Sequence, residues 1–347
     1  KHGEGGHKHG EGGHKHGEGG HKHGEGGHKH GEGGHKHGGG GHKGKHGGGG
    51  KKKKFAQSIP DDEFDNEVEE GIKADIRMFS GCEDAQTSAD VQDVAKFGLP
   101  DACGAGGACT NAVLANVKDH RPDTWMGLLK GMRGTLKEKK FKQQVPQLAT
   151  SRKLDIKSPF TLSGGGGGDY KALLIGINYT GQKPGELKGC HNDVAQMREY
   201  IVEHGFPGEV GPNLRVLVDD NTHTDPTKDN IIAGIRWLVR GAKEGDSLFM
   251  HFSGHGGSVR DDSGDEEDGK DETMVPVDYK TAGQIKDDLV LPLPAGVTLS
   301  VVMDCCHSGS ILDLPYAFDA TEEELELVES GNKTTVPKKK KFNVTKV

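Results

Sequence analysis

In the second half of the chain, short apolar runs alternate with segments whose apolar residues recur at a helical period. The runs are rich in Val, Ile and Leu, as buried strands are, and the periodic segments predict amphipathic helices. The first helix has Asn192 as its expected cap and Gly205 after its last turn, and Pro226 precedes the second helix. We therefore expect an α/β fold with a mostly parallel central sheet flanked by helices. The expected strands are residues 170–177, 214–218, 247–252 and 297–303, and the expected helices are residues 192–204 and 227–240.

The first half of the chain adds elements of both kinds. An apolar run at residues 75–80 predicts a strand, residues 124–141 predict an amphipathic helix, and residues 146–151 predict an extended segment. Five consecutive glycines, residues 164–168, separate this half from the second, and their composition predicts a flexible joint. We expect the elements on both sides of the joint to belong to the same sheet.

The two ends of the chain lack the apolar residues that a core needs. The heptad KHGEGGH recurs from residue 1 and degenerates by residue 42, and a Gly- and Lys-rich sequence follows it to residue 54. Such a chain cannot offset a backbone ordering entropy of about 1 to 2 kcal/mol per residue, so we expect disorder. The expected organisation is a disordered tail at 1–54, a small region at 58–163, the glycine linker at 164–168, a larger region at 169–318, and an acidic then basic tail at 319–347.

Charge narrows the class of partner. The first 54 residues carry 12 Lys and 5 Glu, or +7 of a net charge of −8, which leaves −15 on the remaining chain. An acidic body argues against nucleic-acid binding by the core and favours cationic substrates or metal ions. The six cysteines have no paired spacing, which favours a reducing compartment, and no apolar run is long enough for a membrane span or resembles a signal sequence. We therefore expect a cytoplasmic monomer without membrane contact; the lysine runs at 51–54 and 338–341 leave nuclear targeting open.

Two polar motifs follow two of the expected strands. The strand at 247–252 continues into HFSGHGG, residues 251–257, and the strand at 297–303 continues into MDCCHSGS, residues 303–310. If these strands are neighbours, an imidazole and a thiol meet at the carboxyl edge of the sheet, as a Cys-His pair requires. His255, beyond the turn, is then the base. Two unrelated polar loop ends are the alternative.

The alternation of side chains along a strand distinguishes the two adjacent cysteines. Asp304 and Cys306 share one face of the expected strand, while Cys305 shares the opposite face with Met303 and turns back toward packing. Cys306 is therefore the better nucleophile. Its backbone also enters the polar turn HSGS, whose amide groups are available to an oxyanion.

These motifs resemble those of a known protease family. HFSGHGG and DCCHSG closely resemble the His and Cys motifs of metacaspases, and residues 170–318 resemble the whole large (p20-like) catalytic region. The resemblance implies a caspase-haemoglobinase fold and a catalytic dyad of His255 and Cys306. In the small region, FSGCEDAQTSAD at 79–90 and GGACTNAVL at 106–114 resemble the p10-like region of metacaspases. Here that region precedes the catalytic one, an order that resembles type III metacaspases.

Two acidic residues suggest the substrate. Asp304 lies two residues before the expected nucleophile, and Asp193 follows the first strand at the same edge of the sheet, so the two would line an acidic pocket. An ordinary helix N-terminal acid is the alternative for Asp193. The resemblance implies cleavage of protein or peptide substrates after Arg or Lys. It assigns the S1 site, which holds the residue before the cleaved bond, to Cys190, Asp193, Ser253 and Asp304.

Acidic residues also crowd residues 260–272, RDDSGDEEDGKDE. Oxygen ligands suit calcium, although the EF-hand pattern is absent, and a solvated acidic loop is the alternative. The resemblance implies calcium activation, with Asp271, Asp287, Asp288 and Asp313 as metal ligands. The His-rich tail is either a ligand for zinc, nickel or copper or a hydrated spacer.

Together with the resemblance to metacaspases, the sequence predicts a cysteine endopeptidase; the resemblance implies that it is activated by calcium and specific for Arg or Lys, and its lysine runs are then themselves candidate sites of autoprocessing. The alternative is a catalytically inactive caspase-like protein that binds metal or acts as a scaffold. Intact Cys and His motifs argue against the alternative.

Overall fold

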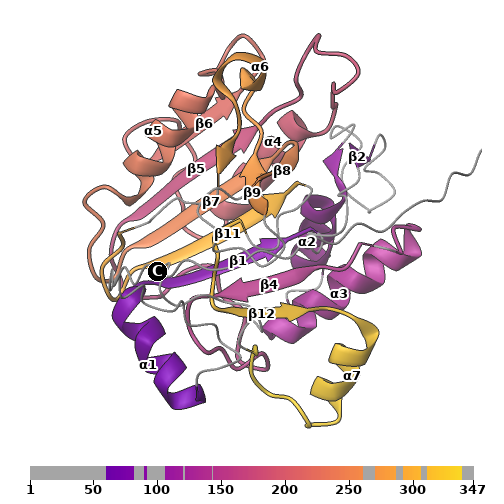
Figure 1. Ribbon diagram of the computed structural model, residues 1–347, viewed down its shortest axis with the longest axis vertical. Helices are drawn as coiled ribbons and strands as arrows, with labels where there is room; N and C mark the ends of the chain where they lie inside the picture. Colours follow the sequence, from indigo (N-terminus) through magenta and orange to yellow (C-terminus); the bar gives the residue numbers. More distant parts are fainter. Residues whose placement is uncertain are drawn as a thin grey trace, which may run out of the picture. The chain divides into compact units, whose positions relative to one another are not determined.

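A seven-stranded sheet organises the chain in the computed structural model, which describes residues 60–81, 90–91, 106–119, 122–142, 144–260, 270–286, 292–305 and 311–337. The strand order is β12-β4-β1-β11-β7-β5-β6 (Figure 1). All pairs from β1 to β6 in this order are parallel, and only β4 pairs antiparallel, with β1 and with β12. The expected mostly parallel sheet is therefore confirmed. The strands are β1 (Asp75–Ser80), β4 (Gln147–Thr150), β5 (Tyr170–Gly176), β6 (Leu214–Val218), β7 (Ser247–Ser253), β11 (Thr298–Asp304) and β12 (Tyr316–Asp319).

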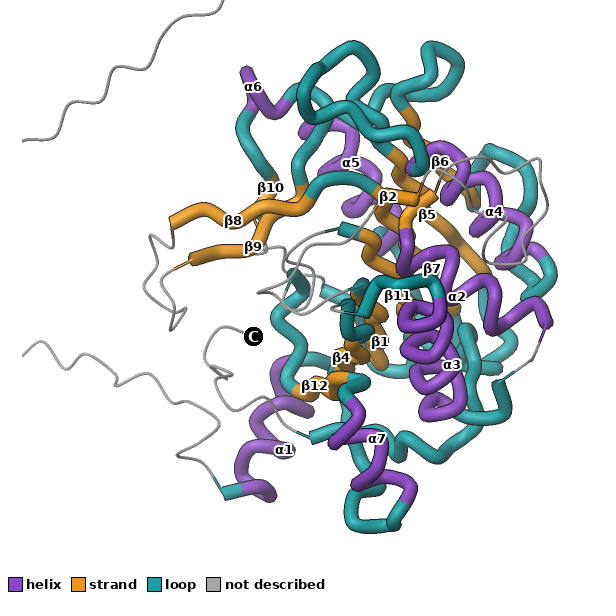
Figure 2. Tube along the Cα trace, turned by 90° about the vertical axis from the view of Figure 1, so that its right-hand side faces the viewer, coloured by secondary structure: helices purple, strands orange, loops and turns teal. Residues whose placement is uncertain are grey.

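Helices cover both faces of this sheet (Figure 2). One apolar cluster packs α2, α3 and α4 against one face and includes the buried side chains of Trp125, Met197 and Phe249. A second cluster packs α5 against the other face, together with a three-stranded sheet of β8, β9 and β10. The helices are α1 (Asp61–Gly71), α2 (Ala108–Asp119), α3 (Trp125–Glu138), α4 (Cys190–Val202), α5 (Lys228–Val239), α6 (Tyr279–Ala282) and α7 (Glu322–Glu329); the short strands are β2 (Asp90–Val91), β3 (Gly106–Gly107), β8 (Gly256–Arg260), β9 (Lys270–Met274) and β10 (Ile285–Lys286).

The start of α4 differs from the prediction. The helix begins at Cys190 after Gly189, so the expected cap Asn192 lies inside the first turn. The Oδ1 atom of Asn178, in the loop after β5, accepts a hydrogen bond from the backbone N of Cys190 (3.0 Å). A side chain from another segment therefore satisfies a first-turn amide, and the helix starts three residues earlier than a cap at Asn192 would allow.

The glycine run lies packed against the turn that precedes β7. The backbone N of Gly168 donates to the carbonyl O of Gly245 (3.1 Å), and a Cβ atom on Gly166 would lie 2.6 Å from the Cα of Gly245. Only glycine allows two backbones to approach this closely. The elements on both sides of the run belong to one sheet, as expected, because β1 and β4 of the small region pair beside β11 of the catalytic region.

Several predictions fall on residues outside the described ranges. These are the disorder and metal binding of residues 1–54, the acidic residues 261–269, and the basic residues after 337. Within the described ranges, none of the helices has the length and apolar character needed to cross a bilayer.

Candidate functional site

The carboxyl edge of the sheet brings the expected His and Cys motifs together. β7 and β11 are parallel neighbours in which Ser253 lies opposite Asp304, and β5 lies on the other side of β7 with Gly176 opposite Ser253. His255 therefore follows one strand, and Cys305 follows the next at the same edge. Cys306 is outside the described residues, so its position relative to His255 stays a prediction.

Three contacts hold His255. Its backbone N donates to the hydroxyl of Tyr179 (2.9 Å), its carbonyl O accepts from the backbone N of Val275 (3.1 Å), and its ring Nε2 lies 2.7 Å from the carbonyl O of Gly185. The rings of His255 and Tyr179 lie 4.7 Å apart, centroid to centroid. Because a carbonyl oxygen only accepts, Nε2 carries the proton of this hydrogen bond. In the neutral ring, Nδ1 is then free of its proton and can accept one.

Tyr179 forms a second connection between His255 and Val275. Its hydroxyl donates to the carbonyl O of Val275 (2.7 Å) while it accepts from His255, and the side chain is 1% exposed. Burial raises the pKa of Tyr179 far above its usual value, so the phenol stays protonated. Tyr179 adopts a φ of 52°, a left-handed conformation that costs a non-glycine residue free energy and is common at functional sites.

A carboxylate at the end of β6 fixes the loop that carries Tyr179. Asp219 accepts from the backbone N atoms of Asn178 (2.8 Å) and Thr180 (3.0 Å) and lies 2.6 Å from the Nε2 atom of His191. Burial alone would raise the pKa of Asp219, but these hydrogen bonds and the nearby His191 outweigh it and lower the pKa. The carboxylate therefore stays ionised and holds the backbone on both sides of Tyr179.

Sequence reasoning missed Tyr179, Gly185, His191 and Asp219. One signal was available, because Asp219 directly follows an expected strand at the carboxyl edge of the sheet, where Asp304 was noticed. Nothing local marks Gly185 as the carbonyl that orients His255, since the contact depends on how the loop after β5 folds.

The adjacent residues Asp304 and Cys305 point to opposite faces, as the alternation predicted. Cys305 is 1% exposed and packs in the same apolar cluster as Met303, on the side of α5. Asp304 is 4% exposed and turns to the side of α2, where its Oδ2 atom accepts from the backbone N of Thr110 (2.7 Å). The packing of Cys305 gives it a structural environment, separate from the face on which Asp304 lies.

Three of the expected S1 residues lie together. Asp193 is fully buried, and its Oδ2 atom accepts from the hydroxyl of Ser253 (2.6 Å), which in turn lies beside Asp304 in the sheet. The carboxylate of Asp193 points at these neighbouring segments. Cys190 begins α4 next to the end of β5 and is 4% exposed. The structure thus assembles an acidic, largely buried cluster beside His255.

The expected calcium ligands are only partly described. Asp271 is 1% exposed; its Oδ2 atom lies 2.7 Å from the Nζ of Lys286, and its buried Oδ1 atom has no hydrogen-bond partner. Asp313 follows β11 with a φ of 44°, and Asp287 and Asp288 are outside the described residues. Among the residues that are described, no three His, Cys, Asp or Glu side chains are grouped to hold a metal.

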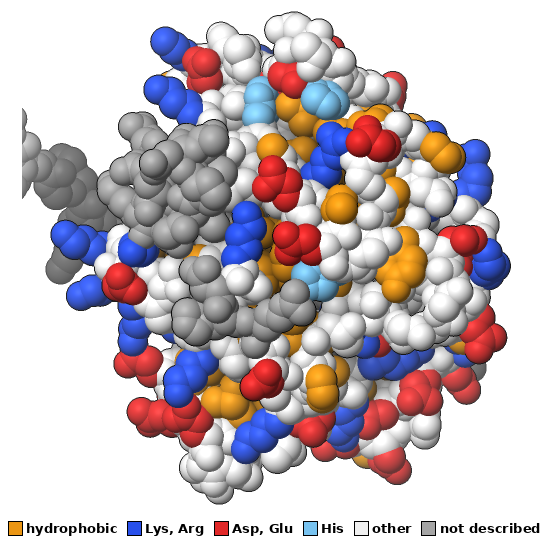
Figure 3. Space-filling model, turned by 180° about the vertical axis from the view of Figure 1, so that it is seen from behind, with side chains coloured by type: hydrophobic (Ala, Val, Ile, Leu, Met, Phe, Trp, Pro, Cys, Tyr) orange, Lys and Arg blue, Asp and Glu red, His pale blue; other side chains and the backbone are white. Residues whose placement is uncertain are grey.

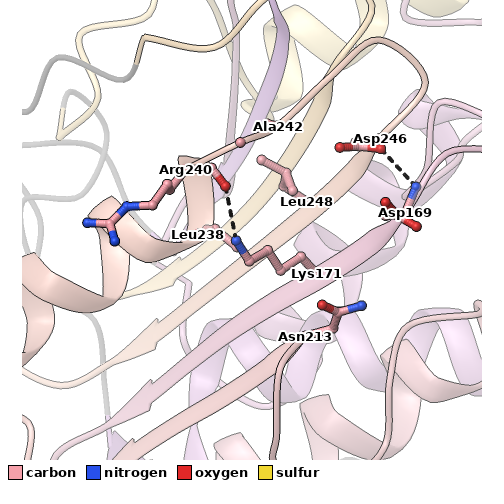
Figure 4. A pocket seen from close by; sticks show the side chains of 9 residues that line it. Asp169, Lys171, Asn213, Leu238, Arg240, Ala242, Asp246 and Leu248 are labelled. Atoms are coloured by element: carbon pink, nitrogen blue, oxygen red, sulfur yellow. Dashed lines mark hydrogen bonds between the residues drawn. The ribbon is translucent and has the colours of Figure 1, made fainter.

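Acidic and basic side chains are interspersed over the face seen in Figure 3. A cavity of about 110 Å³ is lined by Asp169 and Lys171 at the start of β5 and by Asp246 and Leu248 at the start of β7 (Figure 4). Lys171 donates to the carbonyl O of Arg240, and Asp246 accepts from the backbone of Asp169. These contacts close the amino end of the sheet, far along the strands from His255.

Comparison with known proteins shows the family of the chain. Residues 170–315 match the family described as metacaspase, peptidase C14 domain. Metacaspase III c of Phaeodactylum tricornutum is 50% identical over 284 residues, which are 76% of this chain and 83% of that protein. Metacaspase-1 of Mycosarcoma maydis (49% over 158 residues) and Metacaspase-1A of Aspergillus oryzae (52% over 159) each match 44% of this chain, and 38% and 37% of their own lengths. The chain therefore belongs to the metacaspase family, in its type III form, and is a cysteine-type endopeptidase with the caspase-like fold.

Proposed function

We propose that this metacaspase cleaves peptide bonds after Arg or Lys, with Cys306 as nucleophile and His255 as general base and acid, and that calcium activates it. The observation that carries the proposal is the attachment of His255. Its backbone is held at both N and O, and its Nε2 is held by Gly185, which leaves Nδ1 for proton transfer at the edge of the sheet where β11 ends.

The proposed reaction has two steps. The Nδ1 atom of His255 takes the proton of the Cys306 thiol, and the thiolate attacks the scissile carbonyl carbon. The tetrahedral intermediate collapses to a thioester, and His255 returns the proton to the leaving amine. Water, deprotonated by His255, then hydrolyses the thioester and regenerates the thiol. The hydrogen bond to Gly185 supports the ring in the orientation that both transfers need.

The preference for a basic residue rests on the buried acidic cluster. Asp193 and Asp304 present two carboxylates on adjoining segments; Ser253 donates to Asp193 and lies opposite Asp304 in the sheet. An Arg or Lys side chain brings the opposite charge to a site shielded from water, where attraction is stronger than at the surface. A substrate with Asp at this position would meet two like charges.

Calcium fits the donors at Asp271. Its buried Oδ1 atom lacks any hydrogen-bond partner, which is costly for a carboxylate unless a cation arrives. Calcium accepts 6 to 8 oxygen ligands at flexible angles, so it can gather Asp271, Asp287, Asp288 and Asp313. In its absence Lys286 serves as the counter-ion of Asp271. Asp271 lies in β9, and its partner strand β8 begins directly after His255. Calcium that stabilises the pairing of β8 and β9 would therefore also stabilise the position of His255.

Hydrolysis of fluorogenic peptides tests the proposal. Peptides that end in Arg, Lys or Asp are compared in calcium and in excess chelator, with the wild type, His255→Ala and Cys306→Ala. We expect cleavage after Arg and Lys only, dependence on calcium, and loss of turnover in both variants. Cleavage after Asp would refute the acidic pocket, full activity of metal-free enzyme would refute calcium activation, and turnover by Cys306→Ala would refute the dyad.

A further inference from the structure

Both acidic residues of the proposed S1 site rest on a short stretch of the small region. The backbone N of Gly107 donates to both carboxylate oxygens of Asp193 (3.0 and 2.8 Å), and the side-chain amide of Asn111 lies 3.4 Å from Oδ1. Three residues after Gly107, the backbone N of Thr110 donates to Asp304 (2.7 Å). The start of α2 therefore contacts two carboxylates that come from α4 and from the end of β11.

The chemistry of these contacts suits carboxylates. The first amide groups of a helix have no partner within it, and the helix dipole places partial positive charge at the same end. Two buried carboxylates side by side would otherwise repel, and each would favour its neutral form. Donors from α2 offset this repulsion because they hydrogen-bond the charged form, and the charged form is the one that attracts a basic side chain.

The geometry at Gly107 leaves no room for another residue. A Cβ atom at this position would lie 2.2 Å from Oδ2 and 2.5 Å from Cγ of Asp304. Any side chain there would therefore push the Asp304 carboxylate away. Gly107 thus supplies a donor to Asp193 and space for Asp304 at once.

This stretch is part of the core and is not a removable plug. Ala108, Cys109, Thr110 and Ala112 are all fully buried, and α2 packs in the apolar cluster with α3 and α4. Asn111 also donates to the carbonyl O of Gly107 (2.6 Å), which stiffens the turn. A substrate could not displace such a segment without unfolding the helix.

We propose that Gly107 and Thr110 are specificity-determining residues, which position Asp193 and Asp304 for the basic P1 side chain. In this arrangement the small region forms the floor of the S1 site, although its walls belong to the catalytic region. The proposal rests on the Arg/Lys specificity proposed above. It adds that Asp193 and Asp304 select a basic side chain only when the start of α2 is packed against them.

Two peptide aldehydes that differ only at P1 test it. One carries the arginine side chain and the other the citrulline side chain, which has the same shape without the charge. The inhibition constants are measured against an Arg peptide for the wild type, Gly107→Ala and Gly134→Ala. Gly134, on α3 in the same region, is the matched control, because a Cβ atom there meets nothing within 4 Å.

We expect the wild type and Gly134→Ala to favour the arginine aldehyde by at least about 100-fold, as a desolvated charge pair implies. Gly107→Ala should lose at least about tenfold of this preference, with its affinity for the citrulline aldehyde little changed. A general loss of structure would weaken both inhibitors equally and leave their ratio unchanged. An unchanged ratio in folded Gly107→Ala would overturn the proposal, and so would a gain in activity, which a plug would give.

A second variant covers the case in which Gly107→Ala does not fold, as judged by its melting curve. Asn111→Ala removes the donor that holds both the Gly107 turn and Asp193, so the ratio should fall in the same direction by a smaller factor. An unchanged ratio in Asn111→Ala would then overturn the proposal. Failure of the wild type itself to distinguish the two aldehydes would instead refute the proposed Arg/Lys specificity.

Discussion

Replacing Tyr179 by Phe removes a single hydroxyl that connects the backbone of His255 to that of Val275. The phenyl ring is kept, so its contact with the His255 imidazole should persist. The change removes an acceptor for the N–H of His255 and a donor for the carbonyl O of Val275, at distances of 2.9 and 2.7 Å. The bond from Val275 N to His255 O is kept, and so is the ladder of β8 and β9 that continues from it, with Gly256 opposite Met274.

The magnitude follows from these two bonds. A buried polar group left without a partner costs about 1 to 3 kcal/mol, and two groups lose their partner here, so the free energy of unfolding should fall by about 2 to 6 kcal/mol. Without its amide anchor, His255 can shift relative to the thiol, and a misplacement near 1 Å costs about 100-fold in rate. We therefore expect kcat to fall by about 10- to 100-fold while KM for an Arg peptide changes little, because the acidic cluster is untouched.

Steady-state kinetics and thermal melting check this prediction, with Tyr170→Phe as the control at the opposite end of β5. Since the raised pKa of Tyr179 keeps its hydroxyl protonated, the ratio of variant to wild-type kcat should stay constant between about pH 6 and 9. A variant that loses stability but keeps kcat within about twofold of wild type would show that the hydroxyl only stabilises the fold.

Three further predictions concern the cysteines, specificity and calcium. Cys306→Ala should abolish turnover, whereas Cys305→Ser should keep most of it with a stability loss of about 1 kcal/mol; equal loss in two folded variants would contradict the assignment. Asp304→Ala should weaken the binding of the transition state of Arg peptides by about 2 to 5 kcal/mol, which is measured as a fall in kcat/KM. A variant that cleaves Arg peptides at the wild-type level would count against the acidic pocket. Lys286→Met should lower the calcium dissociation constant, measured by calorimetry, by about tenfold, because the competing counter-ion of Asp271 is gone; equal or weaker binding would show that Lys286 does not compete.

The strands of the sheet could be predicted from the sequence because each is a short, buried apolar run. β1 and β6 have the bounds expected, β5 and β7 differ by one residue at their last position, and β11 lies one residue later at both ends. The expected helices at 124–141 and 227–240 likewise formed, with Thr124 and Thr227 as side-chain caps. In all these cases the deciding interactions are local or follow the period of the element.

The rest depended on contacts between distant segments. Asn178 decided where α4 begins, and the loop after β5 brought Gly185 to His255, 70 residues later in the chain. The amides of Gly107 and Thr110 reach carboxylates 86 and 194 residues away. No local pattern predicts which partner a polar group finds across such separations, and for this reason the contacts that Gly107 and Thr110 make with Asp193 and Asp304 were not expected.

The interleaving of the sheet has a consequence for how the chain is held together. β1 of the small region pairs with β11 of the catalytic region over six residues on one side and with β4 on the other. β12, which follows the catalytic strands in the chain, pairs with the free side of β4 and forms the edge of the sheet. The covalent path between the two regions runs only through the glycine run at the far end of the strands. A single cut there would leave two fragments that still pair through the parallel β1–β11 ladder and the antiparallel β4–β12 ladder and that share apolar clusters. Such an enzyme can be nicked without being divided, and the order of its two regions along the gene is free to change while the assembled sheet stays the same.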